Sequence, residues 1–194
     1  MDTVRFRHAH FSARFPVDCL YTPSHFWMRP ADGAAGQAVV DAAEAAVSDT
    51  PRLWHVGFTK FATRMLGELV EMVLELKPGQ TVAGGERLGT VEGFKAVSDL
   101  FCVVDGTLSA ANPALTAEAC LTHSDPYGAG WLYAVQGTPT PDYLDVHGYI
   151  ALLTATIDQL QASRYSDGGS HAAAEPAQSD EPEPSTEPES GADA

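Results

Sequence analysis

Basic side chains are scarce in this chain. It has 11 Lys and Arg against 26 Asp and Glu in 194 residues, which gives a formal net charge of −15. A nucleic-acid partner is therefore excluded, because binding to phosphates needs clustered Lys and Arg, and a strongly acidic partner is disfavoured as well. Eight of the acidic residues lie between Ser166 and Ala194, where no Lys or Arg occurs, so about half of the excess charge belongs to that segment.

Paired cysteines and metal-ligand spacings are missing too. The chain has three cysteines, Cys19, Cys102 and Cys120, and they form no CxxC pair. An odd number of unpaired cysteines predicts neither a disulfide framework nor a zinc site. The seven histidines also lack the spacing of metal ligands, so we expect no metal.

Long apolar runs do not occur. No run of eighteen apolar residues is present, which predicts no membrane-spanning helix, and the N-terminus lacks the apolar stretch of a secretory signal. We expect a cytoplasmic protein, or an organellar one if the chain is eukaryotic. The arginine-bearing opening "MDTVRFRHAHFSARFP" could also be an organelle-targeting peptide, but Val4, Phe6 and Phe11 favour an edge strand that packs on the core.

Signatures of catalysis are absent as well. The chain has no nucleophile elbow and no Ser/His/Asp arrangement with a favourable spacing. The glycines of "AGGERLG" at 83–89 lie between predicted strands and lead into no helix, so they mark a turn rather than a phosphate-binding loop. An enzyme is therefore the least favoured class of function.

The composition predicts one folded domain and two segments with little capacity to form a core. Hydrophobic residues make up 44% of the chain, enough for a core, and we place the domain at residues 1–162. Residues 163–194 form an acidic tail rich in Pro, Glu, Ser and Ala, which predicts disorder. The alanine-rich segment 31–51 is expected to be a mobile insertion, with a short helix possible at 37–47.

Short apolar strands separated by glycine turns fill the region between Leu53 and Val135. This pattern predicts a mainly β fold, either a flattened barrel or a sandwich. Thr59 is a good N-cap for one short internal helix, which Gly67 would end. A second helix, amphipathic and C-terminal, is expected after Asp142, because apolar residues recur there at helical spacing.

A lone lysine occupies the turn in "GTVEGFKAVSDLF" at 89–101, between two predicted strands. A lysine on a turn is ordinarily just solvated. A lysine that another enzyme must acylate, however, has to stand clear of its own fold on a rigid backbone, and the tip of a hairpin meets that need. Acylation removes the charge and turns the side chain into a long neutral arm. Lys95 is thus a candidate modification site.

An ordered set of motifs around this turn resembles the H protein of the glycine cleavage system, a lipoyl carrier. The resemblance extends from about Leu20 to Leu153, and its segments are "YTPSHFW", "VGFTKFATRMLGELV", "LKPGQTVAGGERLG", "GTVEGFKAVSDL", "DGTLSAANPAL" and "DPYGAGWL". Biotin carriers share the fold but flank their lysine with methionines, whereas Phe94 and Ala96 stand here, which favours lipoate. The resemblance implies the lipoyl type of fold, also called a barrel-sandwich hybrid.

The resemblance also implies a function. Lys95 would carry lipoate in amide linkage, and the arm would shuttle the aminomethyl group of glycine among three enzymes. These partners would be the glycine decarboxylase (P protein), the aminomethyltransferase (T protein) and the dihydrolipoamide dehydrogenase (L protein). A lipoate ligase or lipoyl transferase would attach the cofactor. The chain itself would be a carrier rather than a catalyst, because the cofactor carries the chemistry.

A carrier of labile cargo should offer it a protected groove near the root of the arm. We name as candidates for arm or partner recognition His25, Glu92, Gly93, Phe94, Ser98 and Asp99. Glu92 and Asp99 could equally be solvated flanks of the hairpin, and His25 is more typical of a hydrogen-bonded strand histidine. Acidic residues at this place would also steer a basic partner surface.

The chain departs from the family pattern near these residues. Family members commonly have Glu-Ser-Val-Lys at the turn, where this chain has Glu92-Gly93-Phe94-Lys95, and we expect the glycine to loosen the approach to the lysine. Phe26 stands where the opening motif usually has an acidic residue. Two alternatives therefore stay open: an H-like lipoate-binding protein that serves sulfur oxidation or lipoate relay, and a lipoyl-fold module that is never modified and only binds.

Overall fold

The computed structural model describes residues 2–31 and 51–168, with side chains up to residue 163. The insertion predicted at 31–51, with its possible helix, falls almost entirely outside these residues. So does most of the tail predicted from residue 163, although the last helix continues past that boundary to Gly168. The predicted domain limits therefore stay predictions.

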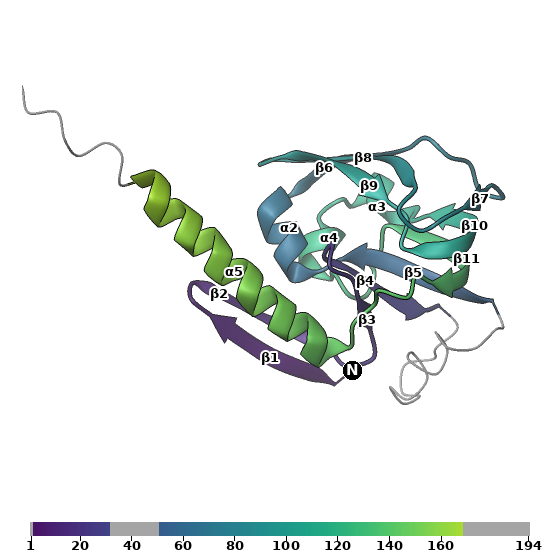
Figure 1. Ribbon diagram of the computed structural model, residues 1–194. Helices are drawn as coiled ribbons and strands as arrows, with labels where there is room; N and C mark the ends of the chain where they lie inside the picture. The colour runs from purple at the N-terminus through teal and green to yellow at the C-terminus, as the bar shows by residue number, and fades with distance from the viewer. Residues whose placement is uncertain (1, 32–50, 169–194) are drawn as a thin grey trace, which may run out of the picture. The chain divides into compact units, whose positions relative to one another are not determined.

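The strands of the described chain form three antiparallel sheets (Figure 1). The first sheet is a hairpin of β1 (Thr3–His8) and β2 (Phe11–Pro16). The second has six strands in the order β3 (Leu20–Tyr21), β4 (Phe26–Pro30), β5 (Arg52–Phe58), β11 (Tyr133–Pro139), β10 (Val104–Ala111) and β7 (Thr81–Val82). The third has three, in the order β6 (Leu69–Leu74), β8 (Arg87–Gly93) and β9 (Val97–Phe101). The mainly β class predicted from the glycine-punctuated strands is confirmed.

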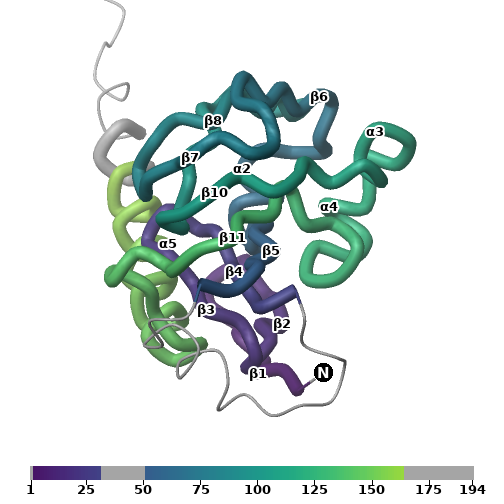
Figure 2. The backbone as a smooth tube through the Cα atoms, turned by 90° about the vertical axis from the view of Figure 1, so that its right-hand side faces the viewer, coloured from purple at the N-terminus to yellow at the C-terminus, as the bar shows by residue number. Residues whose placement is uncertain are grey.

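The two helices predicted within the described residues are both present. In α2 (Lys60–Leu66), the side chain of Thr59 accepts a hydrogen bond from the backbone N–H of Ala62, and Gly67 ends the helix with a φ of 84°. The C-terminal helix α5 (Val146–Gly168) buries Tyr149, Leu153 and Ile157, which are spaced four residues apart. Two single-turn helices, α3 (Ala114–Ala117) and α4 (Leu121–Ser124), were not predicted; they lie close together in Figure 2.

Two clusters of buried side chains form the core. The first cluster joins the six-stranded and three-stranded sheets, which face each other in both views (Figure 1 and Figure 2), and it includes Trp54, Val91 and Leu108. The second lies between the β1–β2 hairpin and the first turns of α5, where Phe15, Tyr21 and Tyr149 pack ring against ring. The aromatic-rich N-terminus is therefore part of the folded core, as its apolar residues indicated.

Candidate functional site

The hairpin predicted from the sequence is present, and Lys95 is exposed at its tip. Strands β8 and β9 pair as far as Glu92 and Val97, and the backbone N–H of Gly93 donates to the carbonyl of Ala96 at 2.9 Å, which closes the turn. The neighbouring Phe94 is also exposed, with 76% of its surface accessible. A foreign enzyme can therefore reach this amine without unfolding the hairpin.

The turn is fixed against the end of α2. The backbone N–H of Phe94 donates to the carbonyl of Glu68, and that of Lys95 donates to the carbonyl of Leu66, each at 3.0 Å. These two bonds satisfy carbonyl groups at and just beyond the last turn of the helix, which would otherwise lack partners. The lysine is thus presented by a braced loop rather than a flexible one.

Gly93 has a different role from the one expected of it. A Cβ atom at this position would lie 2.4 Å from the carbonyl oxygen of Leu66, which is far inside van der Waals contact. The glycine therefore permits the hairpin to approach α2 closely enough for the two anchoring hydrogen bonds. The expectation that Gly93 loosens the approach to Lys95 is wrong.

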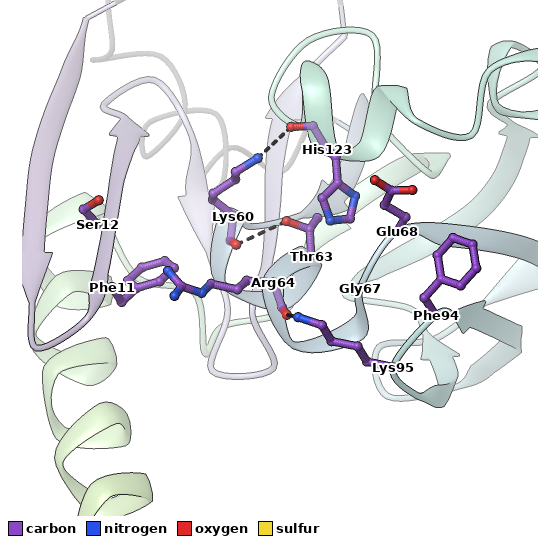
Figure 3. A pocket seen from close by; sticks show the side chains of 10 residues that line it. All are labelled: Phe11, Ser12, Lys60, Thr63, Arg64, Gly67, Glu68, Phe94, Lys95 and His123. Carbon is purple, nitrogen blue, oxygen red and sulfur yellow. Dashed lines mark hydrogen bonds between the residues drawn. The ribbon is translucent and has the colours of Figure 1, made fainter.

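A groove of about 480 Å³ begins beside Lys95 (Figure 3). Its volume falls within the range of small-molecule pockets, about 300–1,000 Å³. Strand β2, helix α2 with the two residues that follow it, the turn and helix α4 all contribute to its lining, which consists of Phe11, Ser12, Lys60, Thr63, Arg64, Gly67, Glu68, Phe94, Lys95 and His123. The groove joins the root of the lysine to a surface of α2.

Hydrogen bonds and ring contacts position the charged groups of this groove. Nζ of Lys95 donates to the carbonyl of Arg64 at 3.2 Å, and Nζ of Lys60 donates to the carbonyl of His123 at 2.7 Å. The guanidinium of Arg64 lies 5.5 Å from the centre of the Phe11 ring. Burial, followed by the nearby charge of Lys60, lowers the pKa of His123, which favours the neutral imidazole.

Two of the predicted recognition residues, Ser98 and Asp99, lie on strand β9 and do not line the groove. Asp99 pairs with Arg87 at 2.7 Å, and Arg87 also pairs with Glu75 at 2.7 Å, so the three side chains form an ion network across the three-stranded sheet. The hydroxyl of Ser98 donates to the carbonyl of Asp99. Both Ser98 and Asp99 are exposed outside the groove lining, and their roles in recognition stay predictions.

Glu92 and His25 also lie outside the groove lining. Glu92 is exposed near the end of β8, two residues before the turn. Nδ1 of His25 is 3.0 Å from the hydroxyl of Tyr149, which in turn is 2.8 Å from the hydroxyl of Thr59. His25 adopts a positive φ of 65° and packs on the Phe61 ring with 4.6 Å between ring centres. Its surroundings are those of a structural histidine, and a functional role remains a prediction.

The environment of His25 predicts a loss of stability in acid. Burial lowers its pKa from 6.5 to about 4, so the unfolded chain takes up a proton that the folded chain resists as the pH falls through this range. The parent protein therefore loses unfolding free energy between pH 7 and pH 4. We expect this loss to be smaller by roughly 2 kcal/mol in His25→Asn, after allowance for solvent screening. Asparagine tolerates a positive φ, so the turn is retained.

Urea unfolding of the parent and the variant at both pH values checks this prediction. His55 and His123 also have lowered pKa values because they are partly buried, so the parent will lose further stability from them. The difference between parent and variant isolates His25. An equal loss in the two proteins would show that His25 does not resist protonation.

A groove near the root of the arm was expected from the sequence, but its place beside α2 and its two cations on that helix were not predicted. Lys60 and Arg64 are four residues apart, which places both on one face of a helix. Because this helix had been predicted, the spacing of the two residues could have indicated a cationic face on it. No local sequence pattern indicated the lining residues Phe11, Ser12 and His123, because only the tertiary fold brings them to α2.

Within the described part of the chain, no cluster of His, Cys, Asp or Glu side chains could hold a metal ion. Among the described helices, none has the length and apolar character needed to cross a membrane.

Comparisons with known proteins agree with this geometry. The family model "Glycine cleavage H-protein" matches residues 40–146. The glycine cleavage system H protein of Corynebacterium jeikeium is 35% identical over 136 residues, which are 70% of this chain and 94% of that protein. That of Mycobacterium avium is 40% identical over 121 residues, or 62% and 77% of the two chains.

A solved structure gives the same result in three dimensions. The crystal structure of a glycine cleavage system H protein from Mycobacterium marinum is 37% identical to this chain, with a TM-score of 0.55. The similarity covers 71% of this chain and 97% of that one. Because the sequence motifs, the braced lysine hairpin and the coverage of 77–97% of these relatives coincide, the chain belongs to the glycine cleavage H-protein family.

Proposed function

We propose that Lys95 carries lipoate in amide linkage and that the chain is the lipoyl carrier of a glycine cleavage system. The observation that supports this most strongly is the exposed amine of Lys95 on a hairpin braced by α2, in a chain of this family. Its partners would be the glycine decarboxylase, the aminomethyltransferase and the dihydrolipoamide dehydrogenase, with a lipoate ligase or lipoyl transferase for attachment. As the relatives named above are bacterial, we propose a cytoplasmic location.

The residues around Lys95 fit such a group. When bound, lipoate supplies a disulfide that accepts a one-carbon amine unit and electrons. Acylation removes the charge of Nζ but leaves an N–H group that can still donate to the carbonyl of Arg64. The groove that begins at Lys95 is apolar at Phe11 and Phe94, which suits the hydrocarbon part of the arm.

The fold itself would supply presentation and recognition. A tethered arm replaces separate diffusional encounters by a search at high effective concentration. The hydrogen bonds from Phe94 and Lys95 to the end of α2 keep the root of the arm fixed, so that only the arm moves. Glu71, Glu92 and Asp99 are exposed carboxylates on the same three-stranded sheet, and they would favour partners with a basic surface.

The function can be tested by isotope exchange. Lipoylated protein, mixed with the decarboxylase, glycine and labelled bicarbonate, should bring label into glycine. The same chain purified without lipoate should give only the background of the decarboxylase alone. If a chain that mass spectrometry shows to be lipoylated also gives only background, the glycine cleavage role is contradicted.

A further inference from the structure

The groove beside Lys95 is unusually cationic for this chain. Only 11 Lys and Arg occur in 194 residues, yet Lys60, Arg64 and Lys95 all line this one groove. Glu68 is the single carboxylate among the lining residues, and burial lowers the pKa of His123, which favours its neutral form. Once Lys95 is acylated, two cations and one carboxylate remain.

None of these charges is neutralised by an ion pair among the residues that the structure describes. The ion pairs there join His8 to Asp158, Arg29 to Asp18, and Arg87 to both Glu75 and Asp99. Lys60 instead donates to a backbone carbonyl, and Arg64 covers the Phe11 ring. Their positive charge is therefore available to whatever enters the groove.

The two cations lie on the helix that the Lys95 side chain contacts. Nζ of Lys95 is already at the carbonyl of Arg64, and Lys60 is one helical turn further toward the start of α2. One turn of helix is about 5.4 Å, less than the length of an extended lipoyl chain. Figure 3 shows both side chains beside the groove, with Lys60 directed toward His123 and Arg64 directed toward Phe11.

We infer that Lys60 and Arg64 stabilise the thiolate form of the reduced lipoyl arm in this groove, which makes the arm a better nucleophile near neutral pH. The inference rests on the proposed attachment of lipoate to Lys95. The reaction is a proton dissociation from the thiol to solvent, with no other bond changed. Neighbouring Lys and Arg lower the pKa of a protein thiol in this way.

The same charges give the groove selectivity. An ammonium group placed beside Lys60 and Arg64 is repelled, whereas a thiolate is attracted. The groove therefore favours the thiolate form of the reduced arm over its neutral thiol form. Glu68 opposes this preference, because its carboxylate faces the same groove.

The test measures the pKa of the arm thiols directly. Lipoylated protein is reduced, and the rate of its alkylation by iodoacetamide is followed against pH by mass spectrometry of the peptide that contains Lys95. All proteins carry Cys120→Ser, because Cys120 is an exposed free thiol that would compete for the reagent. The intact mass of each preparation is recorded first, to establish that lipoate is present.

We expect the double variant Lys60→Gln, Arg64→Gln to raise the thiol pKa by about one unit. Each single variant should raise it by less, and Glu68→Gln should lower it. Lys77→Gln is the matched control for Lys60→Gln. Lys77 is an exposed lysine outside the groove, and both substitutions remove one positive charge. The shift in the double variant should shrink at high salt.

The outcomes separate this inference from the proposed function. If the double variant is lipoylated and its thiol pKa equals that of the parent, the role of Lys60 and Arg64 is overturned while the carrier function stands. An equal shift in Lys77→Gln would also overturn it, because the effect would then come from net charge. A parent chain that is never lipoylated overturns the proposed function itself.

Discussion

Substitution of Lys95 by arginine should abolish lipoylation and carrier activity completely and leave the fold intact. The guanidinium of arginine stays protonated, so it offers no nucleophilic amine for acylation. The hydrogen bond from residue 95 to the carbonyl of Leu66 uses the backbone N–H and survives the change. We expect the free energy of unfolding to stay within about 0.5 kcal/mol of the parent value, as for most surface substitutions.

Intact-mass spectrometry, a lipoyl immunoblot and a thermal melt together check this prediction. Lys77→Arg is the matched control, since it makes the same change at an exposed lysine away from the hairpin and should alter nothing. Lipoyl signal that persists in Lys95→Arg would place the attachment at another lysine. A large fall in melting temperature would instead show that the Lys95 side chain has a structural role.

Gly93→Ala should have the second largest effect, on both stability and modification. The added methyl group would meet the carbonyl oxygen of Leu66 at 2.4 Å, and a backbone atom yields less readily than a side chain. The hairpin must then move away from α2 and weaken the bonds from Phe94 and Lys95. We expect a loss of about 1–3 kcal/mol, typical of overpacking, and slower lipoylation by the attaching enzyme.

Urea unfolding measures the first effect, and the initial rate of lipoate incorporation measures the second. Ala96→Ser changes an exposed residue of the same turn and should leave both quantities close to those of the parent. If Gly93→Ala matches this control in stability, the close contact between the turn and α2 is not what holds the hairpin. If stability falls but the rate is unchanged, the brace is not needed for recognition.

Local features of the sequence were sufficient to predict the elements that carry the site. Thr59 and Gly67 mark the two ends of α2 because capping depends on residues next in the chain. The hairpin around Lys95 follows from two apolar runs with a short gap between them. The apolar spacing that predicted α5 is the spacing of its buried residues Tyr149, Leu153 and Ile157.

Features that depend on tertiary contacts were not predictable in this way. The groove combines side chains as far apart in sequence as Phe11 and His123, and no local pattern links them. The helices α3 and α4 are four residues each, too short for a helical period to show. Gly93 packs tightly on Leu66, which belongs to a distant segment of the sequence. Without this contact, the sequence suggested only that the glycine would make the turn more flexible.

Peptide-mapped mass spectrometry of the protein, purified from a host that attaches lipoate to its own carriers, tests the acylation of Lys95 most directly. One lipoyl group, found on the peptide that contains Lys95 and on no other, is the result we predict. A chain recovered only at its unmodified mass, or with lipoate on a different lysine, would contradict it.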